Sequence, residues 1–256
     1  YTHPAHWTDE LIKTIADCPK VARYVDIPLQ HIYDNMLRHM GRRIMETKHR
    51  ALLDRMRDRI PALMLRTTFI VGFPGEDDRE FGILRDFIRD FEFERLGVFP
   101  YSKEEGTPSA EFEDAIPQEL IDARLEELML LQQEIAFRHN RKRVGEFTEV
   151  IIDSPEEEHD DPAGDAPFKA AISRSYGESP EIDPVVFITP PGGEPCDEES
   201  PAAMPEGVLE LSCETPAPTS PLAGERRTVE IIGSRGYDLI ATIVGSGDHE
   251  RKNSGD

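Results

Sequence analysis

The sequence predicts an α/β domain followed by a small all-β domain. In the first half of the chain, strand-like apolar runs alternate with amphipathic helical segments, an order that is typical of βαβ units and a parallel sheet. After Gly145, short β-runs are separated by turns rich in Gly, Pro and Asp, which indicates a small barrel or sandwich. A long helical pattern that begins at Pro117 lies between the two parts.

The first half contains three predicted strands with helices between them. Thr8 is a favourable N-cap for a first helix. The second strand is apolar on both faces at its centre, which indicates a parallel sheet covered by helices. We expect strands at 21–29, 62–73 and 95–102, and helices at 32–43, 48–60 and 78–91. Because three parallel strands are few for an independent sheet, we expect the closing part of a barrel whose first strands precede Tyr1.

The helix that begins at Pro117 ends at a basic cluster, which consists of Arg138, Arg141, Lys142 and Arg143. Cations in the last turn of a helix interact favourably with its dipole, so this cluster is explained without RNA. We expect the first domain to end at residue 143 and the β domain to span residues 144–246. An insertion at about 190–223 is rich in proline and acids and poor in aromatic residues, which indicates disorder. Residues 247–256 form a polar tail.

The net charge of −22 is unevenly distributed along the chain. Residues 144–256 contain 25 acidic and 7 basic residues, a net charge of −18, whereas residues 1–143 contain 26 acidic and 22 basic residues, a net charge of −4. A strongly acidic segment repels a phosphate backbone and attracts a basic protein, so we expect a protein partner rather than RNA. The alternative is that the acidity only keeps the protein soluble.

The sequence contains no apolar run long enough to span a membrane and no recognisable secretory signal. Its three cysteines, Cys18, Cys196 and Cys213, are scattered, without the paired spacing of a zinc site. They are best explained as free thiols in a reducing compartment. We therefore expect a cytoplasmic protein with no membrane partner, in which these cysteines hold no metal.

The stretch TFIVGFPGE, residues 68–76, is a candidate ligand-binding loop. It follows a predicted parallel strand, and ligands of α/β proteins bind at the carboxyl ends of such strands. Gly72 and Gly75 would let the backbone approach a ligand closely, and the N-terminus of the next helix offers free N–H groups. Glu76 and Asp77 are candidate caps of that helix. From the residues alone, a binding site and a plain turn are equally well supported.

Two further polar loops follow the other predicted strands. Gln30 and His31 follow the first strand, and residues 101–107, with Gly106 and Thr107, follow the third. A single histidine in such a place is more often a hydrogen-bonding partner than a base or a ligand. Because parallel strands end at one edge of their sheet, the three loops together predict a ligand mouth. The sequence shows no triad order and no HExxH motif, so it identifies no catalytic residue.

Four stretches of the first half together resemble one family, the radical S-adenosylmethionine (SAM) methylthiotransferases. They are residues 24–43, 65–76, 93–110 and 128–140. The motifs DIPLQH and YSKEEGTPSA within them are most similar to the branch that modifies a ribosomal protein, rather than to the transfer-RNA branch. The second half resembles the TRAM domain that ends these proteins, in residues 173–188 and 228–245.

The resemblance implies both the fold and the reaction. The expected fold is α/β followed by all-β: the C-terminal part of a partial (β/α) radical SAM barrel and a small TRAM-type β-barrel. The full-length protein is expected to transfer a methylthio group to the β-carbon of an aspartate in a basic protein of the small ribosomal subunit. This chemistry requires SAM and two 4Fe–4S clusters.

The resemblance also implies which residues lie near the cofactor. The backbone of Gly72, Pro74 and Gly75 is expected beside the nucleoside. The other candidates, near the cofactor or the substrate, are Gln30, Arg66, Tyr101, Ser102, Gly106 and Thr107. Arg66 has a simpler alternative role as the partner of a neighbouring acid.

The sequence departs from the family pattern in several places. The cysteines of the cluster-binding motifs are missing, so we expect them upstream of Tyr1, in an N-terminal part of the same protein. This segment alone should then hold no cluster and perform no chemistry. Ser173 and Pro184 stand where glycines are usual, which puts the local turn in doubt. Two alternatives are therefore a transfer-RNA methylthiotransferase and a non-catalytic acidic module that binds a basic protein.

Overall fold

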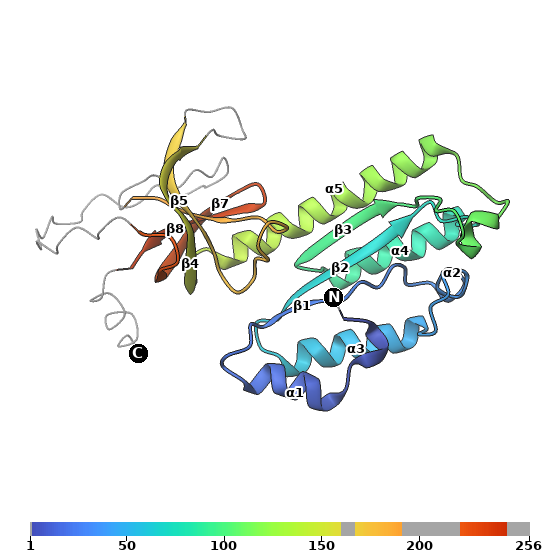
Figure 1. Cartoon of the computed structure of the whole chain (residues 1–256), viewed down its shortest axis with the longest axis horizontal. Coiled ribbons are helices and arrows are strands. Elements are labelled where there is room, and N and C mark those ends of the chain that lie inside the picture. The colour runs from blue at the N-terminus through green and yellow to red at the C-terminus, as the bar shows by residue number, and fades with distance from the viewer. Residues whose placement is uncertain (1, 160–166, 191–220, 245–256) are drawn as a thin grey trace, which may run out of the picture. The chain divides into compact units, whose positions relative to one another are not determined.

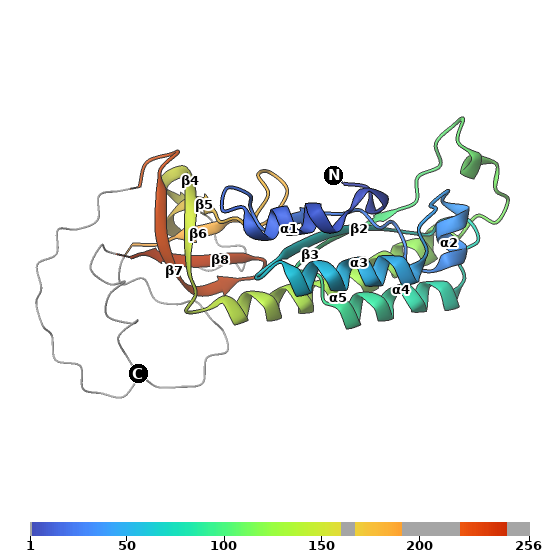
Figure 2. The same ribbon diagram turned by 90° about the horizontal axis from the view of Figure 1, so that it is seen from below.

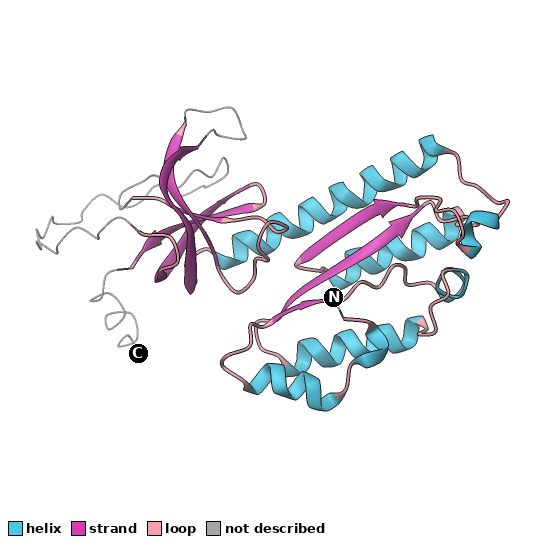
Figure 3. Cartoon of the chain, in the orientation of Figure 1, coloured by secondary structure: helices cyan, strands magenta, loops and turns pink. Residues whose placement is uncertain are grey.

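The computed structural model of the chain describes residues 2–159, 167–190 and 221–244 (Figure 1). The chain divides into two compact units, residues 1–139 and 140–256. Figure 3 shows helices around a small sheet in the first unit and a second unit that, apart from the end of one helix, is built from strands. The predicted insertion at 190–223 lies almost entirely outside the described residues, and the predicted tail at 247–256 lies wholly outside them.

The first unit is built around a parallel sheet in the order β1, β2, β3 (Figure 1). The strands are β1 (Tyr24–Asp26), β2 (Met64–Val71) and β3 (Arg95–Pro100). Asp26 in β1 lies opposite Arg66 in β2, which in turn lies opposite Arg95 in β3. Beyond the end of β1, the backbone of Gln30 pairs again with β2, at Phe69. The three predicted strands are confirmed in order and direction.

Two helices of the first unit, α1 and α4, begin where the sequence predicts caps. The hydroxyl of Thr8 accepts the Leu11 N–H at 3.1 Å and caps α1, and Asp77 caps α4 in a complete capping box with Glu80. No helix among the described residues has the length and apolar character to cross a membrane. The helices are α1 (Asp9–Asp17), α2 (Asp34–His39), α3 (Glu46–Arg59), α4 (Asp78–Phe91) and α5 (Gln118–Arg143), with 3₁₀ turns η1 (Pro4–His6) and η2 (Pro108–Glu111).

The two faces of the sheet differ in their surroundings. Alternate residues of β2, such as Leu65 and Phe69, join a core with residues of α1, α3, α4 and α5, which lie beside the strands in Figures 1 and 2. The residues between them, Arg66, Thr68 and Ile70, are only half-buried. The prediction that β2 is covered on both faces is therefore wrong within the described residues. The strand alternates because the core of this unit lies on one face of the sheet.

A buried histidine makes the stability of the first unit depend on pH. His49 in α3 is 2% exposed. Burial, followed by repulsion from His3 and Arg42, lowers its pKa from 6.5 to about 4. His49 is therefore protonated in the unfolded chain below pH 6.5, whereas in the folded unit it stays neutral down to about pH 4. We expect up to about 3 kcal/mol of unfolding free energy to be lost as the pH falls across this window.

Replacing His49 with leucine should remove this loss and flatten the pH profile of stability between pH 6.5 and 4. The fluorescence of Trp7, the only tryptophan of the chain, can report the unfolding of the first unit, because Trp7 packs against its core. The exposed His6 provides the control, since His6→Leu should leave the profile unchanged. An equal slope in wild type and His49→Leu would contradict the assignment.

The second unit is a closed β-barrel in the strand order β4, β5, β6, β8, β7. All pairings are antiparallel except the one between β6 and β8. Its core is apolar and includes Val150, Val229 and Ile231. The predicted all-β second part is confirmed, but the sequence did not predict β5. The strands are β4 (Phe147–His159), β5 (Phe168–Arg174), β6 (Val186–Ile188), β7 (Arg226–Arg235) and β8 (Asp238–Ile243).

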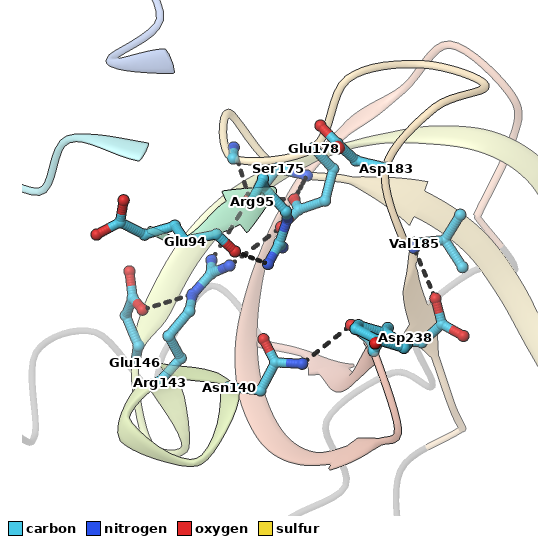
Figure 4. Close-up of polar contacts among 12 residues, drawn as sticks. Glu94, Arg95, Asn140, Arg143, Glu146, Ser175, Glu178, Asp183, Val185 and Asp238 are labelled. Atoms are coloured by element: carbon cyan, nitrogen blue, oxygen red, sulfur yellow. Dashed lines mark hydrogen bonds and ion pairs between the residues drawn. The ribbon is translucent and has the colours of Figure 1, made fainter. Parts of the chain in front are cut away.

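Buried polar contacts attach the last turn of α5 to the barrel (Figure 4). Arg143 forms ion pairs with Glu178 at 3.1 Å and with Glu146 at 3.0 Å. Burial by itself lowers the pKa of Arg143, but attraction to these two carboxylates outweighs it and raises that pKa. Asn140 donates to the carbonyl oxygen of Tyr237 at 2.9 Å. Arg143, the last member of the basic cluster, therefore has a structural role.

The two positions where the sequence departs from the TRAM pattern lie in or beside hydrogen-bonded parts of the barrel. Ser173 is fully buried in β5, and its hydroxyl donates to the carbonyl oxygen of Val186 at 2.8 Å. Before Pro184, the Ser179 N–H donates to the Asp183 carboxylate at 2.9 Å and closes a turn. Within that turn Glu181 adopts a left-handed φ of 63°.

Candidate cofactor site at the carboxyl ends of the strands

The structure brings the second and third strand-end loops together. The Tyr101 N–H donates to the carbonyl oxygen of Val71 at 2.8 Å, and the ring centroids of Tyr101 and Phe73 are 5.0 Å apart. Farther along the third loop, Phe112 packs edge-on against Phe73, and the Gly75 N–H donates to the carbonyl oxygen of Asp114 at 3.0 Å. The third loop therefore folds back over the second, which the sequence did not indicate.

The first loop reaches the same edge of the sheet through Gln30. Its N–H donates to the Thr68 carbonyl oxygen and its carbonyl oxygen accepts the Ile70 N–H, both at 2.9 Å. Gln30 adopts a left-handed φ of 74°, which costs a non-glycine residue about 1–2 kcal/mol. Such strain persists only where the surroundings enforce it, and it is found preferentially at functional sites. Its side chain is half-buried at the predicted mouth.

Gly72 and Gly75 both adopt the left-handed region, with φ of 73° and 86°, but they differ in their surroundings. A Cβ on Gly72 would lie 2.4 Å from Cγ1 of Ile121 in α5, so close packing of this helix already requires glycine there. A Cβ on Gly75 would meet only the His39 ring, at 4.0 Å. Packing of α5 therefore accounts for glycine at position 72 without a ligand, whereas the backbone at Gly75 has open space.

The structure gives Arg66 a charged partner and buries Pro74. The guanidinium of Arg66 forms an ion pair with Asp26 at 2.8 Å, on the face of the sheet opposite the helical core. This contact supports the simpler role that the sequence left open for Arg66. Pro74 is buried between the two glycines of the turn.

The candidates of the third loop differ in how their polar groups are used. The Tyr101 hydroxyl is buried and has no hydrogen-bond partner among the described residues. Ser102 donates to the Glu104 carboxylate at 2.9 Å, and Thr107 donates to the Glu104 carbonyl oxygen at 2.7 Å. Gly106 has a φ of 80° and open space beside it. Among the candidates of the third loop, the Tyr101 hydroxyl is thus the buried polar group whose hydrogen bonding a ligand would complete.

Glu76 is the residue whose role the sequence misjudged. It does not cap α4, because Asp77 holds the N-cap position. Instead it is fully buried and forms an ion pair with Arg124 of α5 at 2.8 Å. A signal for this pair was present in the sequence, since Arg124 lies on the apolar stripe of α5, three residues after Ile121 and four before Leu128.

The described residues do not provide a metal site. No group of three or more His, Cys, Asp or Glu side chains within them is arranged to hold a metal ion. Cys18 is the one cysteine among the described residues, and it is half-buried in the turn after α1. The described residues therefore offer no set of side chains that would hold an iron–sulfur cluster.

The two parts of the chain match two known families. Residues 1–88 match the Radical SAM superfamily, and residues 144–244 match the TRAM domain. The chain therefore consists of a portion of a radical SAM domain, with the parallel sheet and its rim, followed by a TRAM β-barrel.

Named relatives define the group more closely. The "Ribosomal protein uS12 methylthiotransferase RimO" of Opitutus terrae is 44% identical over 245 residues, which cover 96% of this chain and 43% of that protein. The protein of the same name from Myxococcus xanthus is 35% identical over 254 residues, which cover 98% of this chain and 45% of that protein. The chain is a homologue of these RimO methylthiotransferases, and it spans less than half of their length.

Proposed function

We propose that the full-length protein containing this segment is a methylthiotransferase that modifies the β-carbon of an aspartate in ribosomal protein uS12. The observation that carries this proposal is the 44% identity to a uS12 methylthiotransferase over 96% of the chain, through both units. It favours the ribosomal-protein branch over a transfer-RNA enzyme. It also disfavours a non-catalytic acidic module, because the radical SAM part is retained.

In this proposal, the first unit supplies one wall of the SAM site. Bound SAM, together with a reduced 4Fe–4S cluster, supplies the radical that removes hydrogen from the substrate carbon. We expect the nucleoside beside Gly75, where a Cβ would meet only the His39 ring, and the Tyr101 hydroxyl and Gln30 offer polar groups at the same rim. We expect the cysteines of both clusters in the part of the protein outside this segment. The segment alone is then inactive.

The TRAM barrel is proposed to dock the basic substrate protein, and the whole protein is proposed to act in the cytoplasm. The charge supports docking less strongly than the sequence suggested. The described residues from 144 onward contain 12 acidic and 5 basic residues, a net charge of −7. The remaining net charge of −11 in residues 144–256 belongs to residues that the structure does not describe. Within the barrel, the exposed acids Glu156, Glu157 and Glu158 on β4 form the densest negative run.

The test is a reconstitution of the full-length enzyme with both clusters, SAM and a reductant, followed by mass spectrometry of its products. A uS12 peptide that contains the target aspartate should gain one methylthio group, and the same peptide with alanine in place of that aspartate should gain none. Modification of transfer RNA without modification of uS12 would show that the branch is wrongly assigned. Absence of both products would favour the docking module.

A further inference from the structure

Three buried side chains connect the strand-end loops to α5, and we call His31, Glu76 and Arg124 the Glu76 cluster. We propose that Glu76, held in place by Arg124, is a positioning residue that sets the shape of the 72–75 turn for SAM binding. This inference rests on the proposed function, because it assumes that the turn lies beside SAM. None of the three residues is proposed to contact SAM or the reacting atoms.

Glu76 fixes the turn from its far end. Its Oε2 atom accepts the Gly72 N–H at 2.8 Å, so one carboxylate oxygen closes the loop across four residues. The same oxygen accepts from Nη1 of Arg124 at 2.8 Å. Both side chains are nearly inaccessible to water, with Glu76 1% and Arg124 3% exposed. Hydrogen bonds to a buried carboxylate are strong and directional, so the backbone at Gly72 has little freedom.

Arg124 extends this attachment to the beginning of α4. Its Nη1 also donates to the carbonyl oxygen of Glu76 at 3.0 Å, and its Nη2 donates to Asp78 at 2.8 Å. Its guanidinium carbon lies 5.1 Å from the centre of the Phe81 ring. One planar side chain thus holds the end of the turn and the first turn of α4 against α5. A lysine could not make these contacts together.

His31 brings the first loop to the same carboxylate. Its Nδ1 accepts the Tyr33 N–H at 3.0 Å, which assigns the ring proton to Nε2. That Nε2 faces Oε1 of Glu76 at 3.5 Å, and both atoms are buried without a hydrogen bond among the described residues. A small movement would complete this hydrogen bond. The cluster therefore connects the loop that contains Gln30 with the turn that contains Gly75.

The energetics favour positioning over stability as the role of the cluster. Burying an ion pair costs desolvation energy that is often not recovered, and apolar residues of similar volume commonly stabilise a fold as well or better. The Gly72 N–H, however, needs a buried acceptor while that residue is in the left-handed region and Ile121 packs against it, and an apolar side chain would supply none. The ion pair of Glu76 and Arg124 therefore serves to hold the 72–75 turn in one conformation.

The experiment uses full-length enzyme and S-adenosylhomocysteine, an unreactive probe, with affinities measured by calorimetry on the folded fraction. Glu76→Gln should weaken binding about tenfold or more, and the KM for SAM should rise more than kcat falls. Hydrogen exchange of the amides at 72–76 should accelerate. Glu127→Gln is the matched control, because its ion pair with Arg85 also joins α4 and α5, at 3.0 Å, but is exposed. It should change none of these values.

Arg124→Lys keeps the positive charge but loses the planar guanidinium group with its several N–H donors. It provides the test if Glu76→Gln does not fold. Weakened probe binding in a folded variant supports the inference. A folded Glu76→Gln or Arg124→Lys that binds the probe within about twofold of wild type, with only a lower melting temperature, overturns it. Failure of the proposed function is distinguishable, because uS12 would then stay unmodified in the wild type while the differences in probe affinity persist.

Discussion

Replacing Gly72 with alanine is expected to destabilise the first unit by about 2–5 kcal/mol, as the sum of two separate costs. The first cost is the left-handed φ of 73°, which a residue with a Cβ adopts reluctantly. The second is the new methyl group, which would lie 2.4 Å from Cγ1 of Ile121 and force α5 to move. Denaturant unfolding followed by Trp7 fluorescence measures the loss.

Gly106→Ala separates these two costs. Gly106 has a φ of 80°, but no atom lies within 4 Å of the position that its Cβ would occupy. Its replacement should therefore cost only about 1–2 kcal/mol for the backbone. Combining Gly72→Ala with Ile121→Ala, which removes the opposing γ and δ carbons, should cost less than the sum of the two single changes. Equal losses at positions 72 and 106 would contradict the packing that the structure shows.

Replacing Arg143 with methionine is expected to destabilise the barrel by about 3 kcal/mol, because it removes one partner of a buried ion pair. Glu178 is 5% exposed; it would lose its ion pair with Arg143 and keep its hydrogen bonds from Ser175. Hydrogen exchange of the amides in β4 and β7 reports the stability of the barrel separately from that of the first unit. Exchange through global opening of the barrel should accelerate by about two powers of ten.

Arg226→Met is the matched control for Arg143→Met. Arg226 forms an ion pair with Glu149 at 2.8 Å in the same barrel, but both side chains are more than half exposed. Exposed pairs contribute about 0–1 kcal/mol, so its replacement should leave exchange nearly unchanged. If the two arginine variants lose the same stability, burial is not what makes Arg143 important.

Much of the fold follows from local patterns that the sequence contains. The apolar stripes of α4 and α5 and the caps at Thr8 and Asp77 depend on neighbours within about one helical turn. The alternation of strands and helices along the chain indicates the parallel sheet. Strand β5 was missed because its sequence, FKAAISR, has two alanines and two cations and so has little β-character. Pairing with β4 and β6 makes it a strand.

The candidate site, too, was predicted from the sequence only in part. The sequence located three polar loops at strand ends, and parallel strands necessarily bring those ends to one edge. It could not show that Phe112 and Asp114 return over Phe73 and Gly75, because those contacts join residues about forty positions apart. Nor could it distinguish Glu76 from a helix cap, since its partner Arg124 lies 48 residues away.

The sequence by itself determined the two-part organisation, the direction of the strands and the resemblance to methylthiotransferases, because periodicity, caps and motifs are local properties of a chain. Only the tertiary structure decided why glycine occupies position 72, which carboxylate is buried at the rim, and which arginines form buried pairs. These features depend on which side chains meet after the helices pack on the sheet. Burial then sets the energy of each charge, and burial is a property of the folded chain alone.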